Sequence, residues 1–132
     1  MDEQEFKRRT KDIAIRVLTL AEALPRSVSA SVIGRQIVRS GTSIGSNYRA
    51  ACRAISRADL IAKLGHVEEE ADETLYWMEL LIERQMVTAQ KLQPLMSDVN
   101  EVLAMTVASI QTLRRAKIQN PKSKIQNPKS TI

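Results

Sequence analysis

Five arginines within residues 35–57 have the type and spacing to bind phosphate. They are Arg35, Arg39, Arg49, Arg53 and Arg57. At 100° per residue they fall within a helical arc of roughly 80°, which contains no carboxylate. Guanidinium groups pair well with phosphate oxygens, so this arginine stripe is a candidate surface for nucleic acid.

The next segment, residues 58–84, offers these arginines a second role. It is rich in acids and has only Lys63 and Arg84 as bases. The acids best placed to pair with the arginine stripe are Glu69, Glu70, Asp72 and Glu73. The pairs could form within one chain or between subunits. Phosphate binding and internal ion pairing therefore remain equal alternatives.

Groups suited to catalysis are scarce. The only cysteine, Cys52, has no second cysteine to bond with, and the only histidine, His66, has no glutamate three residues before it. Metal-carboxylate bundles need that Glu-x-x-His pairing on inward faces, and nucleophilic cysteines need a partner base. A phosphate-binding Walker loop is also missing. We expect no enzymatic activity, no metal site and no cofactor.

The elements that would position these residues are four helices. Apolar residues recur at alternating steps of three and four over residues 3–24, 28–54, 57–85 and from 88 onward. Pro25 ends the first segment, and Ser56 and Thr88 are N-cap candidates for the third and fourth. The expected core positions are Phe6, Thr10, Ile13, Val17, Leu20 and Leu24; Ile33, Ile37, Gly41, Ile44, Tyr48, Ala51 and Ile55; Leu60, Leu64, Val67, Ala71, Leu75, Met78 and Ile82; Leu92, Leu95, Val99, Val102, Thr106, Ile110 and Leu113.

Short connections between four such segments predict an all-α fold, an antiparallel up-and-down four-helix bundle over residues 1–116. Gly41 and Gly45 lie one turn apart near the core face of the expected second helix. Because glycine costs roughly 1 kcal/mol against alanine in a helix, we expect them to permit close approach of a neighbouring helix. A local break of the helix near residues 41–43 is the alternative.

Apolar residues outside the core stripes indicate a contact surface. They are Ala14, Leu18 and Ala21 in the first segment and Ile61, Tyr76 and Trp77 in the third. For the first segment alone, a broad core face is an equal alternative. Both segments together favour burial between subunits of a symmetric homo-oligomer.

The last residues, 117–132, contain KIQNPKS twice in tandem and carry lysines without acids. Pro121 and Pro128 bar a continuous helix, so we expect a disordered tail without a role; a weak basic arm for nucleic acid is the alternative. The chain has no run of apolar residues long enough to span a membrane and no secretory signal. We therefore expect a cytoplasmic protein.

Two stretches carry a family resemblance. QIVRSGTSIGSNYRAACRA, residues 36–54, is similar to a motif that reads Gln, two residues, Arg-Ser, then Ser-Ile, two residues, Asn. EADETLYWMELL, residues 70–81, resembles a later helix of the same family. The matching positions are Gln36, Arg39, Ser40, Ser43, Ile44 and Asn47, then Glu73, Thr74 and Trp77. The family is that of the bundle proteins encoded by intervening sequences in bacterial 23S ribosomal RNA genes.

The resemblance covers about residues 5–115, and it implies a homo-oligomer, expected to be a pentamer. It also implies kinship with accessory proteins of diversity-generating retroelements, which pair a basic oligomer with a reverse transcriptase and nucleic acid. RNA is therefore the preferred nucleic acid, and a scaffold for a protein partner is the alternative function. Ser43 and Asn47 are expected to bond between helices rather than to contact a ligand.

Overall fold

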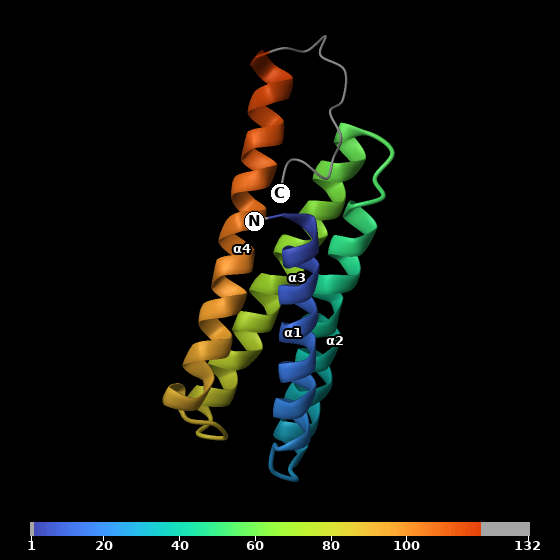
Figure 1. Ribbon diagram of the computed structural model, residues 1–132. Coiled ribbons are helices and arrows are strands. Elements are labelled where there is room, and N and C mark those ends of the chain that lie inside the picture. Colours follow the sequence, from blue (N-terminus) through green and yellow to red (C-terminus); the bar gives the residue numbers. More distant parts are fainter. Residues whose placement is uncertain (1, 120–132) are drawn as a thin grey trace.

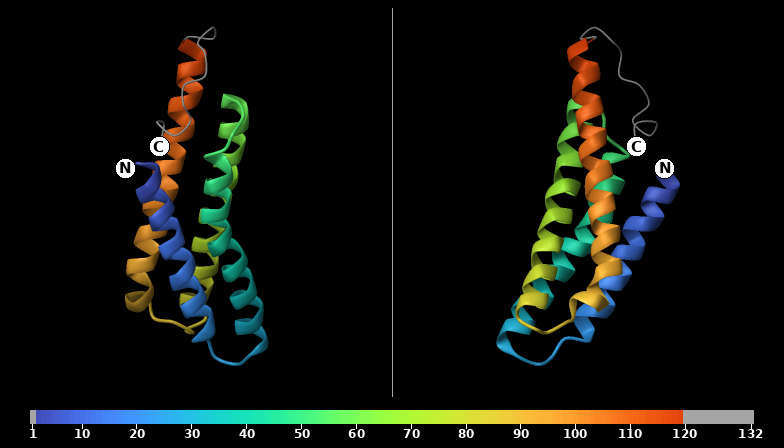
Figure 2. Two further views of the ribbon diagram at one scale, coloured as in Figure 1. Left: turned by 45° about the vertical axis from the view of Figure 1, so that its right-hand side comes forward. Right: turned by 90° about the vertical axis from the view of Figure 1, so that its left-hand side faces the viewer.

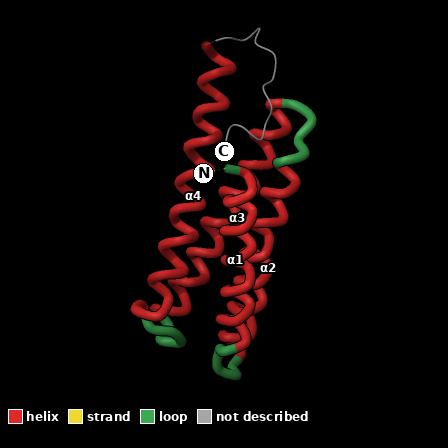
Figure 3. Tube along the Cα trace, viewed as in Figure 1, coloured by secondary structure: helices red, strands yellow, loops and turns green. Residues whose placement is uncertain are grey.

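The computed structural model describes residues 2–119, and within them the chain forms four helices (Figure 1). These are α1 (Glu3–Glu22), α2 (Val28–Ala51), α3 (Arg57–Glu83) and α4 (Ala89–Gln119). They run alternately up and down and are joined by short loops (Figure 3). The predicted all-α bundle is confirmed. Of the predicted tail at 117–132, residues 120–132 lie outside the described residues, and α4 continues past the expected boundary at Ala116.

Each helix begins at a residue whose side-chain oxygen accepts a hydrogen bond from the backbone N–H three residues further on. The N-cap residues are Asp2, Ser27, Ser56 and Thr88. The two caps predicted from sequence have N···O distances of 3.0 Å at Ser56 and 3.2 Å at Thr88. These bonds satisfy backbone donors that the first turn of a helix leaves without partners.

Three helices end earlier than their apolar periodicity predicts. In particular, α2 ends at Ala51 rather than near residue 54, and α3 ends at Glu83. Beyond α3, Gln85 adopts a left-handed backbone with φ of 59°, and the Met86 N–H bonds back to the Leu81 carbonyl at 2.9 Å. That bond closes the helix end as a Schellman motif. Because α2 stops early, Ile55 lies in a turn and is 91% exposed, so its assignment to the core is wrong.

The core runs along the axis of the bundle. Most predicted stripe positions are buried, while Leu20, Leu24 and Ile82 are only half-buried. At one end of the core the rings of Phe6 and Tyr48 pack with centroids 4.3 Å apart. Core packing of this kind joins α1 to α2, α2 to α3, and α3 to α4.

Two glycines allow α1 to approach α2 closely. A Cβ atom on Gly41 would lie 2.9 Å from both γ-carbons of Val17, and one on Gly45 would lie 3.2 Å from the hydroxyl of Thr10. The predicted close approach is therefore confirmed. The alternative of a local break is wrong, since α2 is continuous through both positions.

On its other side, α1 contacts α4 much less than it contacts α2. The views in Figure 2 show α1 beginning well below the upper end of α4. Ion pairs reinforce this contact: Arg9 bonds Glu101 at 2.7 Å, and Arg16 bonds Asp98. Within the described residues, no helix is both long and apolar enough to cross a membrane.

Candidate nucleic-acid interface

The five arginines of the predicted stripe do not share one helix. Arg35, Arg39 and Arg49 lie on α2, whereas Arg53 lies in the turn after it and Arg57 is the first residue of α3. The expectation of one continuous stripe on the second helix is therefore wrong, because α2 ends at Ala51. Arg53 is exposed. Arg57 is half-buried, and its Nε has no hydrogen-bond partner among the described residues.

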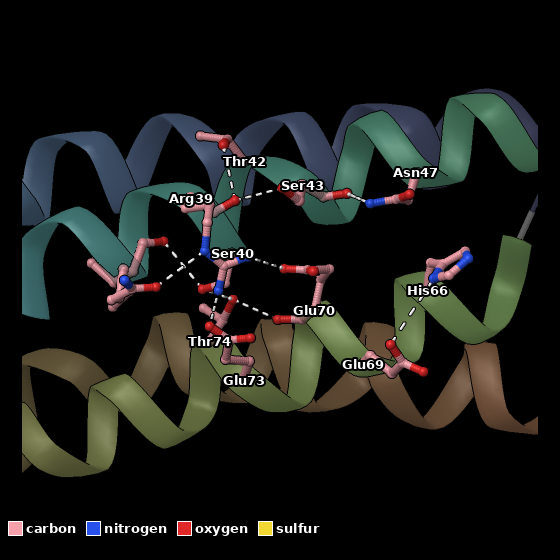
Figure 4. A network of polar contacts seen from close by, with 12 residues as sticks. Arg39, Ser40, Thr42, Ser43, Asn47, His66, Glu69, Glu70, Glu73 and Thr74 are labelled. Atoms are coloured by element: carbon pink, nitrogen blue, oxygen red, sulfur yellow. Dashed lines mark hydrogen bonds and ion pairs between the residues drawn. The ribbon is translucent and has the colours of Figure 1, made fainter.

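Arg39 points toward the acidic face of α3 (Figure 4). Its guanidinium contacts Glu70 at 3.2 Å and also bonds the Glu73 carboxylate. The Nε of Arg39 donates to the side-chain oxygen of Gln36 at 3.1 Å. For this arginine, pairing with the acids of the third helix is the arrangement found, and it occurs within one chain.

Residues of the two family-like stretches meet between α2 and α3. The Glu73 carboxylate that holds Arg39 also accepts a hydrogen bond from the Trp77 indole at 3.0 Å. Beside it, the buried hydroxyls of Ser40 and Thr74 lie 2.9 Å apart. A polar pair that is buried but bonded fixes the register of two helices, because leaving either group without a partner is costly. These positions therefore have a structural explanation.

Ser43 and Asn47 behave differently from expectation. The Ser43 hydroxyl donates to the carbonyl of Arg39 at 2.6 Å, and the Asn47 amide donates to the carbonyl of Ser43 at 2.8 Å. Both bonds lie within α2, so the prediction of bonding between helices is wrong for these two residues. Their short polar side chains form hydrogen bonds to backbone carbonyls of the preceding helical turn. Ile44, between them, is fully buried in the core.

The remaining α2 arginines are exposed. Within the described residues, neither Arg35 nor Arg49 forms an ion pair; Arg35 donates only to the Ser31 hydroxyl, at 2.9 Å. Neighbouring acids therefore neutralise Arg39, whereas Arg35 and Arg49 present their charge to solvent. Sequence alone could not separate them, since all three lie within the same helical arc.

The apolar residues predicted to form an oligomer interface divide into two groups. Ala21, Ile61 and Trp77 are half-buried and pack against the core of their own chain, so a broad core explains them. Leu18 and Tyr76 remain 43% and 53% exposed, and Ala14 is half-buried at the edge of a groove between α1 and α2. Val28 and Val32 near the start of α2 are also exposed and apolar, and neither was among the interface residues predicted from the sequence.

Cys52 and His66 lie apart, since Cys52 is the C-cap residue of α2 and His66 lies within α3. Burial raises the pKa of the Cys52 thiol to about 11, with a further contribution from the Glu3 side chain. A thiol with that pKa stays protonated near neutral pH and is a poor nucleophile or metal ligand. His66 is exposed and lies 4.0 Å from Glu69. In the described part of the chain, no histidine, cysteine, aspartate or glutamate residues group as a metal site would require.

Comparisons with known proteins agree with this architecture. The family model of the 23S rRNA-intervening sequence proteins matches residues 2–108. A crystal structure from Bacteroides thetaiotaomicron VPI-5482, of a protein with unknown function from the S23 ribosomal protein family, shares 37% sequence identity and a TM-score of 0.77. The match covers 84% of this chain and 99% of that one. No curated protein sequence matches. The chain belongs to the 23S rRNA-intervening sequence protein family.

Proposed function

We propose that this chain is a non-enzymatic, self-associating helical bundle that binds RNA through exposed arginines. The observation that carries the proposal is the state of Arg35, Arg49 and Arg53: all three are exposed and, within the described residues, lack a carboxylate partner. An unpaired guanidinium can exchange its counterion for a phosphate without first breaking an ion pair. The family's name, which refers to intervening sequences of 23S rRNA, makes RNA the first nucleic acid to test.

The non-enzymatic part of the proposal rests on the chemistry of the candidate groups. Cys52 has a raised pKa because burial and the Glu3 side chain both disfavour the thiolate, and the buried Tyr48 phenol is its other hydrogen-bond neighbour. Among the described residues, the one charged partner of His66 is Glu69. The first arrangement favours the thiol over the reactive thiolate, and the second pairs a histidine with a carboxylate rather than with a nucleophile.

A protein-interaction scaffold is the competing function. Exposed apolar side chains favour it, since Ile15, Leu18 and Tyr76 all have about half of their surface in solvent. Self-association would use the same residues, so this observation is compatible with both functions. The two functions differ in whether the purified protein binds RNA, and in how that binding responds to salt.

The test is fluorescence anisotropy of a labelled single-stranded RNA of mixed sequence over a potassium chloride titration. We expect binding that weakens steeply with salt. The double variant Arg35→Gln, Arg53→Gln should bind more weakly and reduce the salt slope by about 1.4 units, at roughly 0.7 for each phosphate that the variant no longer neutralises. The matched control is Arg84→Gln, Arg114→Gln, which removes equal charge elsewhere and should bind like the parent. A parent protein that binds no RNA even at low salt would overturn the proposal in favour of the scaffold.

A further inference from the structure

The groove between α1 and α2 gathers bases from both helices on its walls. It has a volume of about 640 Å³ and is lined by ten residues, none of them a carboxylate. Lys7, Arg8 and Lys11 come from α1, and Arg49 comes from α2. The chain therefore presents a surface with cations from two elements, where sequence analysis found arginines of one helix only.

The glycine contact described above creates this groove. Thr10 packs against Gly45, so the two backbones run close together. Lys7 and Lys11 flank Thr10 on α1, and Arg49 follows Gly45 by one helical turn on α2. A larger side chain at position 45 would have to displace Thr10 and separate the two walls. The small residues of the groove, Gly45 and Ala14 among them, leave its floor open to a ligand.

The charges in the groove are available for a ligand. Within the described residues, Lys7, Lys11 and Arg49 form no ion pair, and Arg8 has only Glu5 of its own helix, at 3.6 Å. The acids of α3 lie on the other side of α2, where Glu70 and Glu73 hold Arg39. Acids of α3 thus neutralise Arg39, whereas Arg49, beside α1, keeps its positive charge.

The hydroxyl groups in the groove do not compete as donors. Thr42 donates to the carbonyl of Val38 at 2.7 Å, and Ser46 donates to that of Ser43 at 3.2 Å. The donors left for a ligand are therefore the ammonium and guanidinium groups on the two walls and the amide of Gln4. A lining in which cations predominate suits the phosphodiester backbone, which carries regularly spaced charge.

A second groove continues along the same two helices. It begins one turn further on, at Leu18 and Val38, and its lining includes Arg26, Arg35 and Arg39 together with one carboxylate, Glu22. From Arg49 to Arg35 the bases span roughly 21 Å along α2, at 1.5 Å per residue. That length accommodates several successive phosphates of one strand.

We propose that the groove between α1 and α2 is the phosphate-binding track for RNA, with Lys7 and Lys11 of α1 opposite Arg49 of α2. This inference rests on the proposed RNA-binding function and names the site for it. Recognition would follow the charge of the backbone rather than the base sequence, because Gln4 carries the one side-chain amide among the residues that line the groove, against four cations. The lysines of α1 would then contribute as much as the arginines of α2.

The experiment compares two double variants by anisotropy with the same labelled single-stranded RNA. Lys7→Gln, Lys11→Gln removes the α1 wall, and Lys91→Gln, Arg115→Gln removes equal charge from exposed positions on α4. We expect the first variant to bind about tenfold more weakly near 0.1 M salt, with a salt slope lower by about 1.4 units, while the second binds like the parent. Lys7→Arg, Lys11→Arg keeps the charge and should restore binding.

Equal weakening in both double variants, or in neither, would overturn the track, as would loss of binding in the arginine variant. Failure of the parent to bind RNA would instead overturn the proposed function itself, so the two failures are distinguishable. The single variant Lys11→Gln is a control for misfolding. Because Lys11 is exposed, the melting curve of this variant should match that of the parent protein.

Discussion

Arg39 and Arg49 are the same residue type on the same helix, and their surroundings give them different roles. Arg39 shares its charge with Glu70 and Glu73 of α3, while Arg49 faces the lysines of α1 across a groove. Ion pairs of partly exposed side chains contribute about 0–1 kcal/mol. The ion pairs of Arg39 therefore orient its side chain more than they stabilise the fold. Arg49 is the arginine that is positioned to bind an external anion.

Gly41 is the residue whose substitution tests the close packing of α1 on α2. Gly41→Ala would place a Cβ 2.9 Å from both γ-carbons of Val17, and overpacking of this kind costs about 1–3 kcal/mol. Gly65→Ala is the matched control, because a Cβ there meets nothing within 4 Å and gains roughly 1 kcal/mol of helix propensity. Urea unfolding followed by circular dichroism should show opposite shifts of the midpoint.

A rescue variant separates this clash from a general effect on α2. Val17→Ala removes the two carbons that the new Cβ would meet, so the double variant Gly41→Ala, Val17→Ala should be more stable than the two separate costs imply. If Gly41→Ala instead stabilised the protein as much as Gly65→Ala, the close approach of α1 to α2 would be refuted.

Residues of the core were the most predictable from sequence, and residues at helix ends the least. The stripe from Leu92 to Leu113 is buried throughout, since its period alone decides which side faces inward. Ile55 continued the period of α2 but lies past its end, because period carries no information on where hydrogen bonding stops. The pairing of Arg39 and the basic groove could not be predicted from the sequence. Arg39 pairs with acids of α3, and Arg49 shares the groove with lysines of α1, so both depend on how the helices pack.

At the scale of elements, α2 is the central helix of the proposed site, with a different partner on each edge. Toward α3 it presents Ser40, which bonds Thr74 of α3, and toward α1 it presents glycines and bases. The buried hydroxyl pair sets how α3 sits on α2, while the glycines set how close α1 lies. The buried motif position Ser40 thus supports the packing around the groove and does not line it.

The Ser40–Thr74 pair predicts a specific pattern of unfolding energies. Thr74→Val keeps the volume but removes a hydroxyl from a fully buried site, which costs about 1–3 kcal/mol because Ser40 keeps only its 3.4 Å hydrogen bond to the Ile37 carbonyl. Adding Ser40→Ala removes that partner, so the double variant should cost less than the two single costs added together. Thr19→Val is the control, since the exposed Thr19 hydroxyl bonds only its own helix and its loss should change stability by less than about 0.5 kcal/mol.

These energies are measured by chemical unfolding of the two single variants, the double variant and the control. Simple addition of the two single costs would contradict the pair, because independent sites add. A positive result would also explain why the small polar residue Ser40 occupies a buried position on α2. Its hydrogen bond to Thr74 forms only when α2 and α3 pack in one register.

At the scale of the whole molecule, the exposed apolar residues are the feature that a single chain leaves unexplained. Ile15 and Leu18 lie on α1, Val28 and Val32 near the start of α2, and Tyr76 on α3. The sequence pointed to Leu18 and Tyr76 through their distance from the core stripes. It also pointed to Ala21, Ile61 and Trp77, which pack on their own core, because period cannot give the width of a buried face.

Assembly of the proposed oligomer should depend on the two predicted interface residues that remain exposed. Light scattering at micromolar protein should give a mass well above the 14.8 kDa of one chain, with five times that value as the family-based expectation. Leu18→Glu, Tyr76→Glu should lower the mass, since each charge would be buried without a partner. Ile55→Glu is the matched control: Ile55 is more exposed than either residue but lies in the α2–α3 turn, so its variant should keep the parent mass. A parent protein that scatters as a monomer would show that these apolar side chains serve another partner, and the scaffold function would then gain the support that self-association loses.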